Sequence, residues 1–337
     1  VDALITQNFT TATDTYNVAV GFQAGEQITT GIANVIVGGL AGDSISDADY
    51  NTALGHGSLG TNALGSASTA VGALGTNTVG STSTAVGASA LFLQNPSTAT
   101  DMHNTAVGRS AMYGLTTGIR NTAVGANALD ATVTSNDNTA VGYNAGTAIS
   151  TGASNTAVGA TALGALTTGS SNTAIGYYAL SVASDSASNT GLGNYAGGSI
   201  DTGAFNTAIG ALSLDALTEG SSNTAVGYRA LTTSAASNCT AVGANALALS
   251  TGIENTGIGY NAGDAISTGQ DNTALGYDAL SAVSTNSSNT SIGASSMNRN
   301  TGSHNTAVGH AALGGPAGAG GSNTAIGATA LKALTTG

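Results

Sequence analysis

Charged and aromatic side chains are scarce in this 337-residue chain. Only 7% of the residues are charged and 4% are aromatic, and there are two prolines, one cysteine and no tryptophan. A typical globular domain has roughly 25% charged residues. The shortage of large side chains excludes a core packed with phenylalanine and tryptophan, and the shortage of charge excludes a chain kept disordered by its own repulsion. A regular backbone arrangement is therefore expected.

Basic residues are especially few. Five Lys and Arg stand against 17 Asp and Glu, which gives a net charge of −12. Binding to nucleic acid or to an anionic membrane depends on clustered Lys and Arg, so we expect neither partner. No apolar run approaches the ~20 residues of a membrane-spanning helix, so no membrane insertion is expected. The single Cys239 cannot form a disulfide within the chain.

What the chain does contain is a repeat. A five-residue unit, best written Asn-Thr-Ala-Val-Gly, occurs 19 times, in most steps 17 residues apart. Its copies begin at residues 17, 34, 51, 68, 83, 104, 121, 138, 155, 172, 189, 206, 223, 239, 255, 272, 289, 305 and 323. The widest step holds Phe92 to Pro96, which we interpret as a loop insertion. A repeat this short cannot hold two helices, and its Thr, Gly and Asn content opposes helix.

The columns of the unit predict a short strand. Thr and the aliphatic residue should point one way and Asn, Ala and Gly the other. If each strand pairs with its equivalent one coil away, identical residues stack. We then expect an asparagine amide ladder, an apolar spine and a thin glycine column, represented by Asn121, Asn138, Asn155 and Asn172, by Val124, Val141 and Val158, and by Gly125, Gly142 and Gly159.

Burial is expected on the Thr and aliphatic side of the strand. Val226→Asp should therefore disrupt the fold, whereas Tyr228→Ala, after the invariant glycine, should not. Further apolar residues recur at the twelfth position, as in Ile149 and Leu166, and glycine often follows three residues later, as in Gly152. We expect that glycine to supply the positive φ of a tight corner.

Together these patterns predict an all-β protein, a parallel β-solenoid of about 17 residues per coil and 19 coils over residues 17–337. Residues 1–16 fit the repeat poorly, so a cap or docking segment is expected there. The small Asn-Ala-Gly face suits close approach of another backbone, and a thin roll should be marginal alone. We therefore expect copies of the chain to associate.

Strings such as Asn223-Thr224-Ala225-Val226-Gly227 resemble the head repeats of YadA-like trimeric autotransporter adhesins and similar repeats of bacteriophage tail-fibre proteins. The resemblance covers residues 17–337. It implies a left-handed parallel β-roll, three chains side by side as a homotrimer, and a role in attachment. It also implies an extracellular location, on a cell surface or a virion. The longer period and the shorter unit of this chain depart from the family pattern.

No catalytic or cofactor-binding constellation is evident. His56, His103, His304 and His310 are interpreted as solvent-facing residues, and Cys239 as a small buried apolar group. The densest acidic cluster, Asp43, Asp47 and Asp49, is a candidate calcium site, with a solvated loop as the alternative. The glycines follow the coil period and no phosphate-binding loop occurs. We predict that the protein is not an enzyme and uses no cofactor.

Aromatic residues recur directly after the invariant glycine: Phe22, Tyr143, Tyr177, Tyr228, Tyr260 and Tyr277. Such rings either bind a host-surface glycan or protein or simply cover the coil edge. The sequence favours a structural fibre or adhesin without catalysis. A self-assembling extracellular filament subunit, polymerising end to end, is the alternative. An ice-binding solenoid is a third possibility, disfavoured because the threonine column is expected to be buried.

Overall fold

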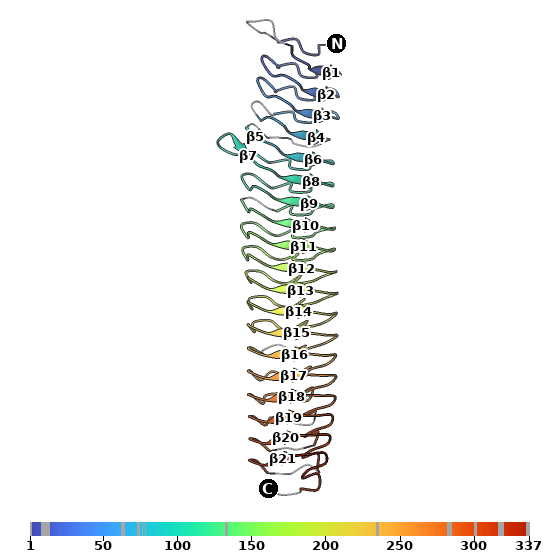
Figure 1. Cartoon of the computed structure of the whole chain (residues 1–337). Helices are drawn as coiled ribbons and strands as arrows, with labels where there is room; N and C mark the ends of the chain where they lie inside the picture. The colour runs from blue at the N-terminus through green and yellow to red at the C-terminus, as the bar shows by residue number, and fades with distance from the viewer. Residues whose placement is uncertain are drawn as a thin grey trace. The chain divides into compact units, whose positions relative to one another are not determined.

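A computed structural model describes residues 2–7, 14–61, 65–72, 75, 77, 79–131, 134–233, 236–281, 285–299, 302–315 and 320–334. Within them the protein is all-β, without helix, and it winds as a parallel β-solenoid (Figure 1). The chain forms two compact units, Val1–Ser170 and Ser171–Gly337. Both are built from the same coil, which begins at the ladder residue, normally asparagine, and whose positions are counted from it.

The first unit contributes eleven short strands. They are β1 (Val18–Val20), β2 (Val35–Val37), β3 (Thr52–Leu54), β4 (Thr69–Val71), β5 (Gly80–Ser81), β6 (Thr84–Val86), β7 (Thr100–Asp101), β8 (Thr105–Val107), β9 (Thr122–Val124), β10 (Thr139–Val141) and β11 (Thr156–Val158). Strands β5 and β7 pair separately, and the others pair in parallel with the equivalent strand of the next coil.

The second unit contributes ten strands, all of them one per coil. They are β12 (Thr173–Ile175), β13 (Thr190–Leu192), β14 (Thr207–Ile209), β15 (Thr224–Val226), β16 (Thr240–Val242), β17 (Thr256–Ile258), β18 (Thr273–Leu275), β19 (Thr290–Ile292), β20 (Thr306–Val308) and β21 (Thr324–Ile326). The register places threonine on threonine and aliphatic on aliphatic, as in Thr207 on Thr224 and Ile209 on Val226.

The interior of a coil is filled from both sides by small and medium apolar residues. In the coil that begins at Asn155, Ala157 points inward from the strand, and Ala162, Leu163 and Leu166 pack against it from the opposite side. All four are almost completely buried. The apolar residues of the twelfth-position column therefore lie in the core, as expected, except that Val79 and Leu334 are half-buried and Val283 lies outside the described residues.

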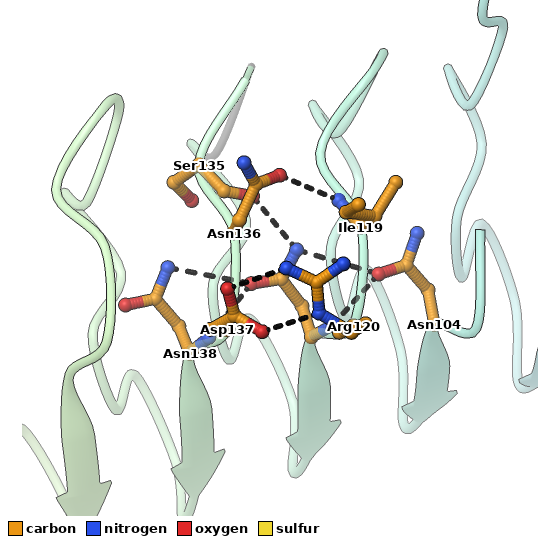
Figure 2. A network of polar contacts seen from close by, with 8 residues as sticks. Asn104, Ile119, Arg120, Ser135, Asn136, Asp137 and Asn138 are labelled. Atoms are coloured by element: carbon orange, nitrogen blue, oxygen red, sulfur yellow. Dashed lines mark hydrogen bonds and ion pairs between the residues drawn. The ribbon is translucent and has the colours of Figure 1, made fainter.

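The buried asparagines form a ladder in each unit, in which Ser68, Ser83 and Cys239 stand in place of asparagine. The Oδ1 of Asn138 accepts the backbone N–H of Asn155 at 2.9 Å and its side-chain amide at 3.1 Å. Each amide also donates across its own coil, as from Asn138 to the carbonyl of Gly152 at 2.9 Å. Figure 2 shows this ladder around Asn104 and Asn138, with the exposed Arg120–Asp137 ion pair beside it. The ladder satisfies backbone groups that the tight coil would otherwise leave unpaired.

The corners are made by residues other than the glycine expected there. Ser154, Thr161 and Leu163 all have φ between 50° and 59°, and the same three positions recur in the other coils. Gly152 does not have a positive φ, so the predicted reason for that column is wrong. A Cβ at Gly152 would instead collide with the carbonyl oxygen of Gly169 in the next coil. Close stacking of the coils, not corner geometry, requires glycine there.

Part of the N-terminal segment continues the solenoid. The N–H of Leu4 donates to the carbonyl of Ala24 at 3.2 Å, the same bond that Leu129 makes to Ala145 at 3.1 Å. Ala33 likewise donates to the carbonyl of Thr15 at 2.7 Å. Residues 2–7 and 14–16 thus follow coil geometry and cover the first complete coil. Residues 8–13 of the predicted cap lie outside the described residues.

The insertion between β6 and β8 is a loop that is partly buried. Gln94 and Pro96 are buried, and Phe92 stacks on Tyr113 with ring centroids 5.3 Å apart. The exposed part of the insertion is Asn95 and residues 97–99. Residues 94–99 lie outside the strands, in agreement with the interpretation of Phe92 to Pro96 as a loop insertion, but Gln94, at the twelfth position of its coil, is buried.

Candidate functional surface

The threonine and aliphatic columns face solvent, which reverses the predicted burial. Val124, Val141 and Val158 stack in register as expected. However, Val124 and Val141 are 38% and 37% exposed, while Ala123, Ala140 and Ala157 beside them are buried. The two columns therefore form an outward stripe, here called the Thr–aliphatic stripe, which consists of the second and fourth positions of the coils within each unit.

The sidedness has a steric cause. At Gly191 and Gly257, which replace the third-position alanine, an added Cβ would come within 2.9 Å of Leu180 Cγ and 2.8 Å of Leu247 Cγ. Where leucine lines the far side of the coil, it therefore leaves space for little more than a methyl group, and the strand turns its alanine inward. In the coil that begins at Asn34, Gly42 stands at the ninth position in place of leucine, and the third position is the buried Ile36.

This burial also removes the basis for the predicted contact face. The Asn-Ala-Gly side was expected to lie against another chain because its side chains are small. It instead packs inside its own coil, where the alanines and asparagines are almost completely buried. Gly142, in the fifth position, has a φ of 138°, and a Cβ there would come within 2.7 Å of Gly159 O in the next coil. The small side chains are therefore required for packing within a coil and between adjacent coils of the same chain.

The stripe is regular, uncharged and half-open. None of its residues is ionisable. The stripe threonines are half-buried in most coils and, among the described residues, their hydroxyls make no hydrogen bond within the chain. Parallel strands place equivalent residues ~4.8 Å apart across coils and alternate residues ~6.6 Å apart along a strand. Each unit therefore presents a lattice of hydroxyl and methyl groups to its surroundings.

The aromatic residues that follow the invariant glycine point outward beside the stripe. Phe22, Tyr143, Tyr177, Tyr228, Tyr260 and Tyr277 are 48–57% exposed. Tyr260 and Tyr277 stack with centroids 5.5 Å apart. In the second unit, Tyr177 also meets Tyr178 and Tyr195, which the sequence analysis did not single out. Their seventh-position spacing in adjacent coils was the available signal.

The candidate metal ligands are not brought together. Asp49 Oδ1 accepts the backbone N–H of Ile32 at 2.8 Å, and Asp47 accepts the hydroxyl of Ser46 at 2.8 Å. Burial raises the pKa of Asp43. Across the described part of the chain, no three His, Cys, Asp or Glu side chains are arranged to hold a metal ion. The four histidines are exposed: His56 and His310 stand at the sixth position of their coils, and His103 and His304 directly precede a ladder asparagine. The two members of each pair belong to different units.

Cys239 takes the place of a ladder asparagine. Its backbone N–H donates to Asn223 Oδ1 at 3.0 Å, and its Sγ accepts the N–H of Asn255 at 3.4 Å. Burial raises the pKa of this thiol. The side-chain amide of Asn255 lacks the Oδ1 of a preceding ladder asparagine and donates instead to the hydroxyl of Ser250 at 3.2 Å, while it keeps the carbonyl of Gly269 at 2.8 Å. The thiol thus has hydrogen-bonding partners in the ladder and is more than a small apolar filler.

Comparisons of the sequence with protein families and with curated proteins identify no similar protein: no family model matches the chain, and a search of the curated proteins finds no match. The resemblance to YadA-like heads and tail-fibre repeats stays a prediction from the repeat itself. In the described ranges no helix has the length and apolar character needed to cross a membrane.

Proposed function

We propose that this chain is a structural fibre element that serves attachment outside the cell, on a cell surface or a virion. The observation that carries the proposal is the in-register stacking of coils within each unit. The outward side of these stacked strands is the uncharged Thr–aliphatic stripe. A β-solenoid of this kind satisfies its backbone coil by coil and offers rigid repeated surfaces.

The stripe is the surface through which copies of the chain would associate. A chain with a net charge of −12 repels its own copies, and the stripe is a long surface free of charge where that repulsion is least. Both partners have the same ~4.8 Å strand period, so the side chains of one stripe can interdigitate with those of another. Cyclic symmetry buries identical faces against one another, and the family resemblance supports three copies.

A charge placed on the stripe should therefore break the assembly. We expect light scattering to give three times 32.1 kDa for the wild-type protein, and a single-chain mass for the double variant Val141→Glu, Val158→Glu. The matched control is the double variant Ser154→Glu, Ser171→Glu, which puts the same two charges on exposed corners and should leave the trimer intact. A folded wild-type monomer, or equal dissociation of the control, contradicts the assembly.

Ice binding is the second candidate, because it was disfavoured only by the expected burial of the threonine column, and that column is not buried. The threonine column faces solvent and its hydroxyls have no partner within the described chain. A rigid array of hydroxyls and methyls can hold waters in fixed positions. We expect no thermal hysteresis from a trimer, whose stripes are covered. A monomer that shows thermal hysteresis, lost in Thr139→Tyr and kept in Ser154→Tyr, would favour ice binding over the fibre.

A further inference from the structure

Three tyrosine rings gather on two neighbouring coils of the second unit. Tyr177 and Tyr178 occupy the sixth and seventh positions of one coil, and Tyr195 the seventh position of the next. The rings of Tyr178 and Tyr195 stack with centroids 5.2 Å apart and planes inclined by 13°. Tyr177 meets both edge-on, at 4.5 Å and 5.8 Å. This tyrosine cluster is the largest group of aromatic contacts among the described residues.

The cluster is open to solvent. Tyr177 and Tyr195 are 50% and 39% exposed, and Tyr178 is half-buried. A ring whose only task was to fill the coil edge would be covered by its neighbours. Here the stacked pair supports the third ring, whose outer face remains available.

Two of the rings stand where the backbone disfavours them. The seventh position has a positive φ, which is 54° at Tyr178 and 55° at Tyr195. Asparagine tolerates this conformation best among residues with a side chain, whereas a bulky residue is an outlier there. Other coils place Asn127, Asn144, Asn245 and Asn261 at the position, and no third coil has an aromatic residue there. The positive φ belongs to the coil itself, since Leu40 and Leu212 also adopt it at this position.

Polar groups converge on the same spot. The pKa of the Tyr177 phenol is raised, first by loss of solvent and then by the phenols of Tyr178 and Tyr195. The exposed Asn194 follows at the sixth position of the next coil, the position equivalent to Tyr177. No charged residue occupies the sixth or seventh position of either coil. The cluster thus combines aromatic faces with neutral donors and acceptors.

We propose that the tyrosine cluster binds a neutral saccharide unit of a surface glycan, with a sugar ring stacked on tyrosine and its hydroxyls bonded to the phenols and to Asn194. The apolar C–H face of a pyranose matches the electron-rich face of an aromatic ring, and its hydroxyls need uncharged partners. This inference rests on the proposed attachment function and names its ligand class. A proline-rich peptide also binds aromatic rings but needs a groove between them, whereas these rings stack directly on one another and two of them are exposed.

The test is affinity electrophoresis of the intact protein in gels that each contain one neutral polysaccharide: mannan, xylan, galactan, β-glucan or starch. We expect retardation of the wild-type protein in at least one gel. Tyr177→Ala and Tyr195→Asn should each weaken it by about tenfold or more. Because asparagine suits the positive φ, Tyr195→Asn should melt at the same temperature as the wild type or higher, which separates lost binding from lost folding.

The matched control is Tyr260→Ala, Tyr277→Ala, which removes an exposed stacked pair that has no third ring. It should be retarded like the wild type. Wild-type mobility unchanged in all five gels, or retardation unaffected by Tyr177→Ala and Tyr195→Asn, overturns the inference, as does binding of a polyproline peptide alone. Light scattering on the same samples keeps the two proposals apart. A monomer that binds sugar refutes the fibre only, and a trimer that binds none refutes the glycan site only.

Discussion

Ala225→Asp should unfold the coils around strand β15, whereas the same change at the adjacent Val226 should be tolerated. Ala225 is completely buried and faces the interior between the ladder and the leucines. An unpaired carboxylate there costs about 3–5 kcal/mol, or the group takes up a proton and stays an unsatisfied polar atom. Val226 is half-buried on the outward stripe, so its carboxylate remains hydrated and costs about 1 kcal/mol through reduced strand propensity.

Thermal melting followed by circular dichroism compares the two variants directly. Val226→Asp should melt close to the wild type when both are measured as single chains, and Ala225→Asp should show a much lower midpoint or no folded signal. Tyr228→Ala serves as a control for surface truncation, because the ring is 52% exposed. Equal midpoints for the two aspartate variants would contradict the inward placement of alanine.

The period, the pairing and the ladder could be predicted from the sequence because each depends on repetition alone. Identical residues one coil apart must stack if the strands are parallel and in register. Asn138 is an example, because its backbone N–H donates to Asn121 Oδ1 and its own Oδ1 accepts the backbone N–H of Asn155. Which side of the strand is buried could not be obtained in this way.

Alternation divides a strand into two faces but does not say which one is inside. The larger aliphatic side chains suggested the inside, and this was wrong. The deciding quantity is the space left by the other wall of the coil, set here by residues such as Leu180 and Leu247 that lie on a different segment. That space depends on how the corners fold, and the corners use positive φ at ordinary residues such as Ser154 and Leu163, which no local sequence preference predicts.

The tyrosine cluster was missed for a related reason. The recurrence that the sequence shows is at the sixth position, where aromatic residues follow the invariant glycine in several coils. Tyr178 and Tyr195 lie one position later, where only two coils carry an aromatic residue. Their rings contact Tyr177 because the backbone turns with a positive φ at the seventh position. This corner conformation could not be predicted from the sequence.

Substitutions within the ladder are accompanied by polar residues elsewhere in the coil. Ser83 is too short to reach the next asparagine, and Gln94 Oε1 accepts the amide of Asn104 at 3.1 Å and the hydroxyl of Ser83 at 3.1 Å. Where Cys239 replaces asparagine, the hydroxyl of Ser250 accepts the side-chain amide of the next ladder residue, Asn255. Both Gln94 and Ser250 stand at the twelfth position, which is otherwise mostly isoleucine or leucine. A missing ladder carbonyl is therefore replaced from the core side of the coil.

This pairing leads to the expectation that Asn138→Ser is severely destabilising and that a second core substitution restores part of the loss. Serine in place of Asn138 removes the acceptor of the Asn155 N–H and side-chain amide, and the donor to the Gly152 carbonyl. Three buried groups lose a partner at about 1–3 kcal/mol each, so we expect a total of about 3–9 kcal/mol. Ile149→Gln places an amide oxygen at the twelfth position, as Gln94 does in its own coil.

Urea or thermal unfolding of the wild type, both single variants and the double variant gives the coupling between the two sites. Ile149→Gln alone should destabilise, because it buries an unpartnered amide in place of a side chain that is 1% exposed. The double variant should be more stable than the sum of the two losses predicts, since each change supplies the partner that the other lacks. Strict additivity would mean that Gln94 and Ser250 do not replace the ladder carbonyl, and that their neighbours tolerate Ser83 and Cys239 for another reason.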